Sequence, residues 1–174
     1  MIETSRLQLL PCTLHHFEAL FQGEEVLADL LDISVPENWT EYPEMVLLAY
    51  DKLRNDPSML GWFFYLVIHK EDRRLIGTGG FKGKACENGV VEIGYEIAGE
   101  YREKGYATEM VMALIGFAFS HSYINTVRAH TLEEYNAAVK VLQKAGMHFA
   151  GAITDQEEDE LWRWEINRAD YQEA

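Results

Sequence analysis

The chain has 174 residues, 48% of them hydrophobic and 25% charged, which are the proportions of an ordinary soluble globular protein. Its formal net charge of −14 argues against nucleic acid as a partner, because phosphate backbones are bound by basic surfaces. Solubility explains this acidity, and so does attraction of a cationic substrate such as an amine. No segment approaches the ~20 uninterrupted apolar residues of a membrane span, and the first residues lack the order of a secretory signal. We therefore expect a single cytoplasmic domain over residues 1–174, with no membrane contact. Its two cysteines form neither a disulfide framework nor a zinc site, so no metal is expected.

The first half of the chain predicts a strand, several helical pieces and then two paired strands. Thr13 is suited to cap the first helix, and Pro36 and Pro43 interrupt the helical region that follows. In order, these elements are a strand at 7–11, a helix at 13–21, helical pieces within 24–55, a buried strand at 62–69 and its hairpin partner at 75–81.

The second half predicts alternating strands and helices that end in a hairpin. A turn at Glu87-Asn88-Gly89 precedes a strand at 90–97, and apolar residues then recur at helical spacing up to about residue 120. A strand at 126–131, a helix at 136–145 and hairpin strands at 150–153 and 161–166 follow. This mixed order predicts an α+β sheet with helices on its faces, because a doubly wound fold would alternate more strictly.

The run from Tyr101 to Glu109 lies between a predicted strand and a predicted helix. A helix start leaves its first backbone N–H groups unpaired, and the helix dipole places partial positive charge there. Gly105 lets the backbone approach an anion closely, and Arg102 and Lys104 add charge. The run is therefore either a phosphate-binding turn or merely the start of a helix.

The pattern R-x-x-G-x-A, from Arg102 to Ala107, resembles the pyrophosphate loop of the GNAT superfamily of acetyltransferases. Three further segments are similar to the ribosomal-protein N-acetyltransferase branch of that superfamily: Thr-Ser-Arg-Leu-Gln-Leu at 4–9, Glu-Ile-Gly-Tyr at 92–95 with the loop that follows, and residues 131–147. Leu-Trp-Arg-Trp at 161–164 resembles a closing strand found in many members of the superfamily. The resemblance implies a mixed, mostly antiparallel sheet that is splayed between its fourth and fifth strands, with helices on both faces.

The same resemblance implies a site for acetyl-CoA in the wedge between the strands at 90–97 and 126–131. The pantetheine arm would pair with Ile97 and Ala98 as an added strand does. Asn136 would reach the cofactor with its side-chain amide, or cap its helix, or do both. Backbone N–H groups would hold the pyrophosphate, and these belong to Arg102, Glu103, Lys104, Gly105, Tyr106, Ala107 and Thr108.

Acetyl transfer to an amine requires removal of a proton from the amine, and a carboxylate near the acetyl group can accept it. Glu92 is the first candidate for this base and Glu96 the second. Period-two alternation places both carboxylates and Gly94 on one face of their strand. His130 is a third candidate, although a hydrogen-bonded strand histidine is the simpler interpretation.

The family's usual proton donors are missing from the helix after Asn136. In the positions where relatives carry Ser or Tyr, this chain has Ala138 and Leu142. Either another hydroxyl, from Tyr135 or Tyr95, assists the leaving thiolate, or the thiolate leaves unassisted.

These residues predict an N-acetyltransferase that moves the acetyl group of acetyl-CoA directly to a primary amine, on a protein N-terminus or a small molecule. The alternative is a CoA-binding sensor or assembly module with little turnover. Trp39 and Tyr42 are candidates for the wall of the acceptor site. The final hairpin leaves two alternatives open: Trp162 and Trp164 pair with a second chain in a homodimer, or they are buried within one chain.

Overall fold

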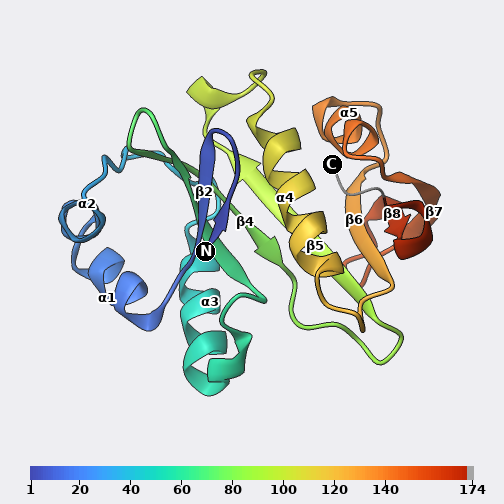
Figure 1. Ribbon diagram of the computed structural model, residues 1–174, viewed down its shortest axis with the longest axis horizontal. Coiled ribbons are helices and arrows are strands. Elements are labelled where there is room, and N and C mark those ends of the chain that lie inside the picture. Colours follow the sequence, from blue (N-terminus) through green and yellow to red (C-terminus); the bar gives the residue numbers. More distant parts are fainter. Residues whose placement is uncertain (172–174) are drawn as a thin grey trace.

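The computed structural model describes residues 1–171 as one eight-stranded sheet with five α-helices (Figure 1). The strands are β1 Ile2–Glu3, β2 Leu7–Pro11, β3 Phe64–His69, β4 Arg74–Phe81, β5 Val90–Ile97, β6 Thr126–Leu132, β7 His148–Thr154 and β8 Glu160–Asn167. The helices are α1 Leu14–Gln22, α2 Glu24–Leu31, α3 Glu44–Asn55, α4 Tyr106–Phe119 and α5 Ala137–Lys144.

The predicted elements are confirmed within a few residues of their ends. Thr13 caps α1 by accepting a hydrogen bond from the backbone N–H of His16, whose side chain accepts from the Thr13 N–H in return. The strand β1 escaped prediction because two residues cannot show a period-two pattern.

The sheet runs in the order β1-β2-β3-β4-β5-β6-β8-β7, and its neighbours are antiparallel except for β5 and β6. The parallel pairing of β5 with β6 covers only three residue pairs, from Val90 with Thr126 to Glu92 with Arg128. Beyond Glu92 the two strands part, which confirms the predicted splay. The β4–β5 register has no shift, so Glu92, Gly94 and Glu96 share one face of the sheet as predicted.

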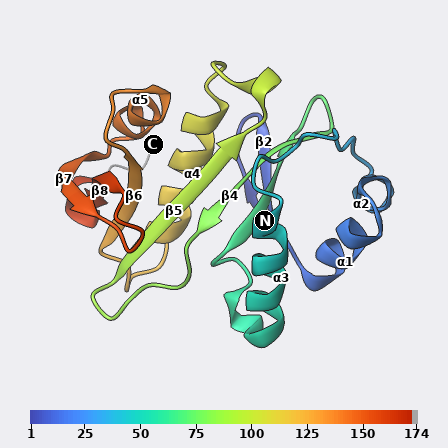
Figure 2. The same cartoon turned by 180° about the vertical axis from the view of Figure 1, so that it is seen from behind.

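Helices cover both faces of the sheet, as predicted. Figure 1 shows α4 in front of β5, and Figure 2 shows β5 in front of α4 from behind. Residues such as Leu114 of α4 and Ile93 of β5 are buried on that side, whereas α1, α2 and α3 bury Phe17, Leu27 and Val46 against the opposite face. Among residues 1–171, no helix is both long and apolar enough to cross a membrane.

Two expectations about tryptophans are decided by burial. Trp39 lies in the core beneath α1–α3 with only 4% of its surface exposed, so the prediction that it walls an acceptor site is wrong. Trp164 is equally buried within the chain, and Trp162 packs beside it against the same core.

Candidate functional site

A cavity of about 1000 Å³ opens where β5 and β6 part. Its walls come from the end of β5, the turn before α4 and the first turns of α4 and α5, which lie at the same end of the molecule (Figure 1). Of the predicted cofactor-binding residues, those in the lining are Ile97, Arg102, Glu103, Gly105, Tyr106, Ala107, Thr108 and Asn136. Ala98 and Lys104 are outside the lining.

The N-terminus of α4 faces this cavity without a side-chain cap. Gly105 occupies the cap position with φ 84°, a left-handed conformation that glycine adopts without strain. The N–H groups of Tyr106, Ala107 and Thr108 have no acceptor within the helix, because they belong to its first turn. These donors and the helix dipole fit a phosphate group.

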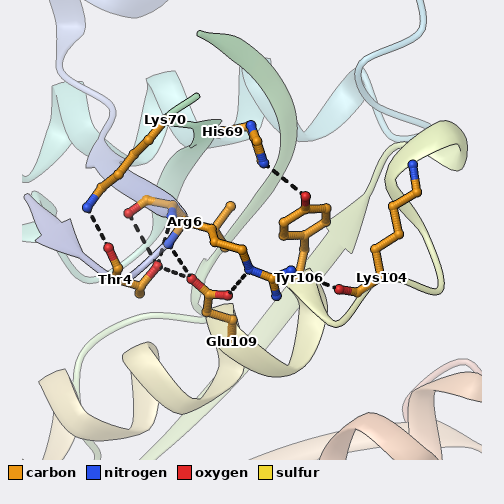
Figure 3. Close-up of polar contacts among 8 residues, drawn as sticks. Thr4, Arg6, His69, Lys70, Lys104, Tyr106 and Glu109 are labelled. Carbon is orange, nitrogen blue, oxygen red and sulfur yellow. Dashed lines mark hydrogen bonds and ion pairs between the residues drawn. The ribbon is translucent and has the colours of Figure 1, made fainter. Parts of the chain in front are cut away.

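The Glu109 carboxylate links the start of the chain to the beginning of α4 through hydrogen bonds (Figure 3). Glu109 accepts hydrogen bonds from the Thr4 hydroxyl at 2.6 Å, the Arg6 backbone N–H at 2.8 Å and the Arg6 Nε at 2.7 Å. Arg6 also donates from Nη1 to the Lys104 carbonyl at 3.1 Å, and its guanidinium lies 4.2 Å from the centre of the Tyr106 ring. Burial alone would raise the pKa of Glu109, but the bonds from Thr4 and Arg6 outweigh it and lower that pKa. Glu109 therefore stays ionised and holds the turn against the sheet.

Tyr106 is fixed from its other end by His69 (Figure 3). The backbone N–H of Asp72 donates to His69 Nδ1 at 3.1 Å, so Nε2 carries the ring proton of the neutral histidine. Nε2 lies 2.9 Å from the Tyr106 hydroxyl and donates to it. The turn is thus held by side chains from β3 as well as from the start of the chain.

Three basic residues line the cavity in a chain that is strongly acidic overall. Arg102 donates from Nε to the Ile97 carbonyl at 2.8 Å and pairs with Glu41 at 2.9 Å. Lys140 and Lys144 lie one turn apart on α5 and line the opposite wall. Sequence reasoning missed both lysines, although their spacing of four on the helix after Asn136 was the available signal.

On the edge of β5 that faces the cavity, the backbone N–H and C=O groups that point outward are those of the odd-numbered residues. Lys82 N donates to the Glu92 carbonyl at 2.8 Å and Ala98 N donates to the Ile76 carbonyl at 2.7 Å, so the even-numbered residues bond toward β4. The backbone groups of Tyr95 and Ile97 point the other way, toward the gap beside β6. The Ala98 carbonyl is also occupied, because it accepts from Tyr101 N at 2.9 Å. The Ile97 carbonyl accepts from Arg102 Nε, so the backbone groups left open toward the gap are those of Tyr95 and the Ile97 N–H, whereas both backbone groups of Ala98 are engaged elsewhere.

Asn136 caps α5, as one of its two predicted roles requires. Its Oδ1 accepts a hydrogen bond from the Val139 N–H at 3.2 Å, and its Nδ2 donates to Glu134 at 3.3 Å. The residue also lines the cavity, so its other predicted role is sterically open.

Glu92 belongs to a series of polar contacts that runs from Lys82, just after β4, through β5 and β6 to β8. Its Oε1 lies 2.9 Å from Lys82 Nζ and 2.7 Å from His130 Nδ1. Arg163 donates from Nε to His130 Nε2 at 3.3 Å, so the neutral histidine carries its proton on Nδ1 and donates it to Glu92. Burial would raise the pKa of Glu92, yet the hydrogen bonds from His130 and Lys82 bring it below its ordinary value. Neither Glu92 nor His130 lines a described cavity.

Glu96 occupies a different setting, between two cavities. It lines the large cavity and also a second one of about 290 Å³, which lies on the sheet face that carries α3. The Thr40 hydroxyl, the Glu41 N–H at 3.2 Å and the Thr78 hydroxyl at 3.3 Å donate to its two carboxylate oxygens. These bonds orient an acceptor-only group at the junction of the cavities.

Tyr42 and Tyr95 are the other two residues that line both cavities. The position of Tyr42 agrees with its predicted place at the acceptor site. The Tyr95 hydroxyl donates to the Ala138 carbonyl at a long 3.5 Å, and burial raises the pKa of Tyr95 to about 12. This phenol remains protonated at neutral pH and is a hydrogen-bond donor beside α5, where Ala138 lines the large cavity.

The other residues considered as proton donors lie elsewhere. Leu142 is fully buried in the core. Tyr135 is exposed, and its hydroxyl donates to Gln143 at 3.1 Å. Within the described part of the chain, no cluster of three His, Cys, Asp or Glu residues has the arrangement of a metal site.

Comparisons with known proteins agree with this geometry. Residues 6–148 match the acetyltransferase (GNAT) domain family. The chain is 24% identical over 148 residues to YjdG of Bacillus subtilis strain 168, an uncharacterized N-acetyltransferase, and the match covers 84% of this chain and 88% of that protein.

Solved structures share the fold at lower identity. The ribosomal L7/L12 α-N-protein acetyltransferase RimL, in complex with coenzyme A, has a TM-score of 0.69 at 15% identity, covering 94% of this chain and 95% of that one. A dodecameric spermidine N-acetyltransferase from Vibrio cholerae has a TM-score of 0.66 at 17% identity, covering 95% of this chain and 96% of that one.

Proposed function

This chain belongs to the GNAT acetyltransferases, and from that premise we propose that its large cavity holds acetyl-CoA while Glu96 accepts the proton of a primary amine. It is an N-acetyltransferase of the GNAT type, and we propose that one such domain spans residues 1–174. The observation that carries the assignment is the position of Glu96 at the junction of two cavities.

The free N–H groups at the start of α4 would receive the pyrophosphate, with Gly105 allowing close approach. Arg102, Lys140 and Lys144 would add positive charge along the cavity. Tyr95 and Ile97 would offer backbone groups to the extended arm of the cofactor. When bound, acetyl-CoA supplies the activated acetyl group.

Transfer forms a nitrogen–carbon bond and breaks the carbon–sulfur bond of the thioester. An alkylammonium has a pKa near ~10 and a chain terminus near ~8, so a proton must leave the nitrogen before it attacks. Glu96 would accept this proton directly or through a water molecule. Glu92, the first candidate from sequence, is already bound by Lys82 and His130 and lies outside both cavities, so the geometry favours Glu96.

Tyr95 would serve the leaving sulfur as a hydrogen-bond donor. Its pKa of about 12 lies well above the ~8.5 of an ordinary thiol, so full proton transfer to the thiolate would be unfavourable. A hydrogen bond still stabilises the negative charge that develops on the sulfur. The nitrogen loses its second proton after it has attacked, and the released thiolate takes up a proton through water. We propose that the acceptor amine belongs to a protein N-terminus or a small molecule.

The test compares Glu96→Gln with Glu92→Gln. Glu96→Gln should lower kcat by about 10²- to 10⁴-fold while leaving acetyl-CoA affinity within twofold, because general-base catalysis contributes on that order. Release of CoA is followed by mass spectrometry with a mixture of amines. Loss of turnover in Glu92→Gln with retention in Glu96→Gln would reverse the assignment, and failure of the wild type to bind acetyl-CoA would refute the proposed cofactor site.

A further inference from the structure

The second cavity is lined mainly by aromatic and other apolar residues and by glycines. Tyr42 and Met45, before and at the start of α3, form one side, and Phe63 and Phe64 contribute aromatic surface from the start of β3. Its volume of about 290 Å³ corresponds to roughly ten water-sized groups, since a water molecule's share of the liquid is ~30 Å³. A phenylethyl group, with eight non-hydrogen atoms, fits within this volume.

Gly94 leaves open space between the two carboxylates of β5, Glu92 and Glu96. A Cβ atom placed there would meet only Lys82 Cε, at 3.8 Å, so ordinary side chains would fit without moving the backbone. The missing side chain leaves space beside Glu96, on the same face of the strand. A larger residue at this position would fill the cavity itself.

Charge in the cavity is limited to one carboxylate and one ammonium among the described residues that line it. Glu96 is the carboxylate, and Lys82 is the ammonium. Lys82 pairs with Glu92, whose carboxylate also binds His130, so Glu92 is not free to receive a second cation. An acceptor with two positive charges would find a single carboxylate, Glu96, for both of them, and Lys82 would repel the second charge.

We propose that the acceptor is a primary amine carried by an apolar skeleton about the size of an aromatic side chain, with no second positive charge. This inference rests on the proposed function. The acceptor ammonium gives one proton to Glu96, and its nitrogen then bonds to the acetyl carbon. As the carbon–sulfur bond breaks, the second proton of the nitrogen passes through water to the departing thiolate, and the apolar body of the acceptor occupies the space above Gly94. A free arylalkylamine and a peptide with an apolar first residue both present this chemistry.

The test measures kcat/KM with 2-phenylethylamine, spermidine, ethylamine, and two peptides that begin with Phe or Lys. We expect the value for phenylethylamine to exceed that for spermidine and for ethylamine at least tenfold, and the Phe peptide to exceed the Lys peptide similarly. The more reactive of phenylethylamine and the Phe peptide then identifies the source of the amine. Preference for spermidine or the Lys peptide overturns the inference but leaves acetyl transfer intact. If acetyl-CoA binds and no amine releases CoA, the proposed function fails and this inference fails with it.

Substitutions at Gly94 test whether the apolar part of the acceptor occupies the second cavity. Gly94→Ala and Gly94→Leu should raise the KM for phenylethylamine progressively, by at least tenfold for Leu, with the KM for acetyl-CoA within twofold. Thermal melting shows whether each variant is folded. An unchanged KM for phenylethylamine in folded Gly94→Leu would overturn the inference.

Discussion

Arg6 and Glu109 join chain segments 103 residues apart, with Arg6 Nε 2.7 Å from the Glu109 carboxylate. The same guanidinium bonds to the Lys104 carbonyl and lies over the Tyr106 ring, so one side chain contacts both the turn before α4 and the start of α4 (Figure 3). The start of the chain thereby contributes to the shape of the proposed phosphate site.

Arg6→Ala should therefore weaken acetyl-CoA binding about tenfold while the KM for the amine changes less than twofold. The cost in folding stability should be only about 1 kcal/mol, because the arginine side chain is 42% exposed and solvent screens its ion pair. Arg73→Ala is the matched control, since it removes an exposed pair with Asp32. Calorimetric titration with acetyl-CoA measures the effect, and equal affinities for both variants would refute a role for Arg6 at the turn.

Replacement of Gly105 should weaken acetyl-CoA binding. A Cβ in its left-handed conformation costs about 1–2 kcal/mol and would lie 3.3 Å from Arg6 Nη2. Gly105→Glu adds a negative charge beside the N–H donors, so acetyl-CoA binding should be abolished while the fold remains. Gly151→Glu is the control, because Gly151 also has positive φ, at 121°, and a Cβ there meets nothing within 4 Å. If Gly105→Glu still binds acetyl-CoA like this control, the phosphate site is elsewhere.

The sequence predicted the elements and the turn before α4 because these depend on local patterns. Periodicity defined the strands and helices, and Gly105 before an apolar helix marked the turn. The roles of Glu92 and Glu96 were harder to separate, because alternation places both on one face. What distinguishes them is their neighbours on other segments of the chain: Lys82 and His130 at Glu92, and Thr40 and Thr78 at Glu96. Such partners come from distant segments and leave no local pattern.

Glu92 should contribute stability that depends on pH. Its pKa is lowered in the folded state, so its contribution is present above the unfolded value of about 4.3 and is lost as pH falls through the folded value. Glu92→Gln should be about 1–2 kcal/mol less stable at pH 7, and the difference should shrink below pH 4. Urea unfolding at several pH values measures it, with exposed Glu133→Gln as control. A difference that grows toward acid would contradict the lowered pKa.

The two cysteines should react at very different rates with a thiol reagent. Cys12 is buried and burial raises its pKa, whereas Cys86 is exposed and backbone N–H groups of Val90 and Asn88 lower its pKa. We expect one fast equivalent in the native protein and a second only after unfolding, and Cys86→Ser should remove the fast one. Two fast equivalents in the native protein would show that the core around Cys12 opens readily.

Tyr95→Phe should separate the leaving-group donor from the general base. The change removes only the hydroxyl beside Ala138 at the large cavity, so acetyl-CoA affinity should stay within twofold while kcat falls about tenfold, the loss typical of one hydrogen bond to a developing charge. Tyr135→Phe is the matched control, because its hydroxyl lies outside both cavities and bonds to Gln143. Because the pKa of Tyr95 is about 12, its loss should lower kcat equally between pH 6 and 9 and leave the shape of the profile unchanged. A kcat unaltered in Tyr95→Phe would mean that the thiolate leaves without help from this phenol, and an effect that vanishes toward pH 9 would mean that Tyr95 ionises in that range.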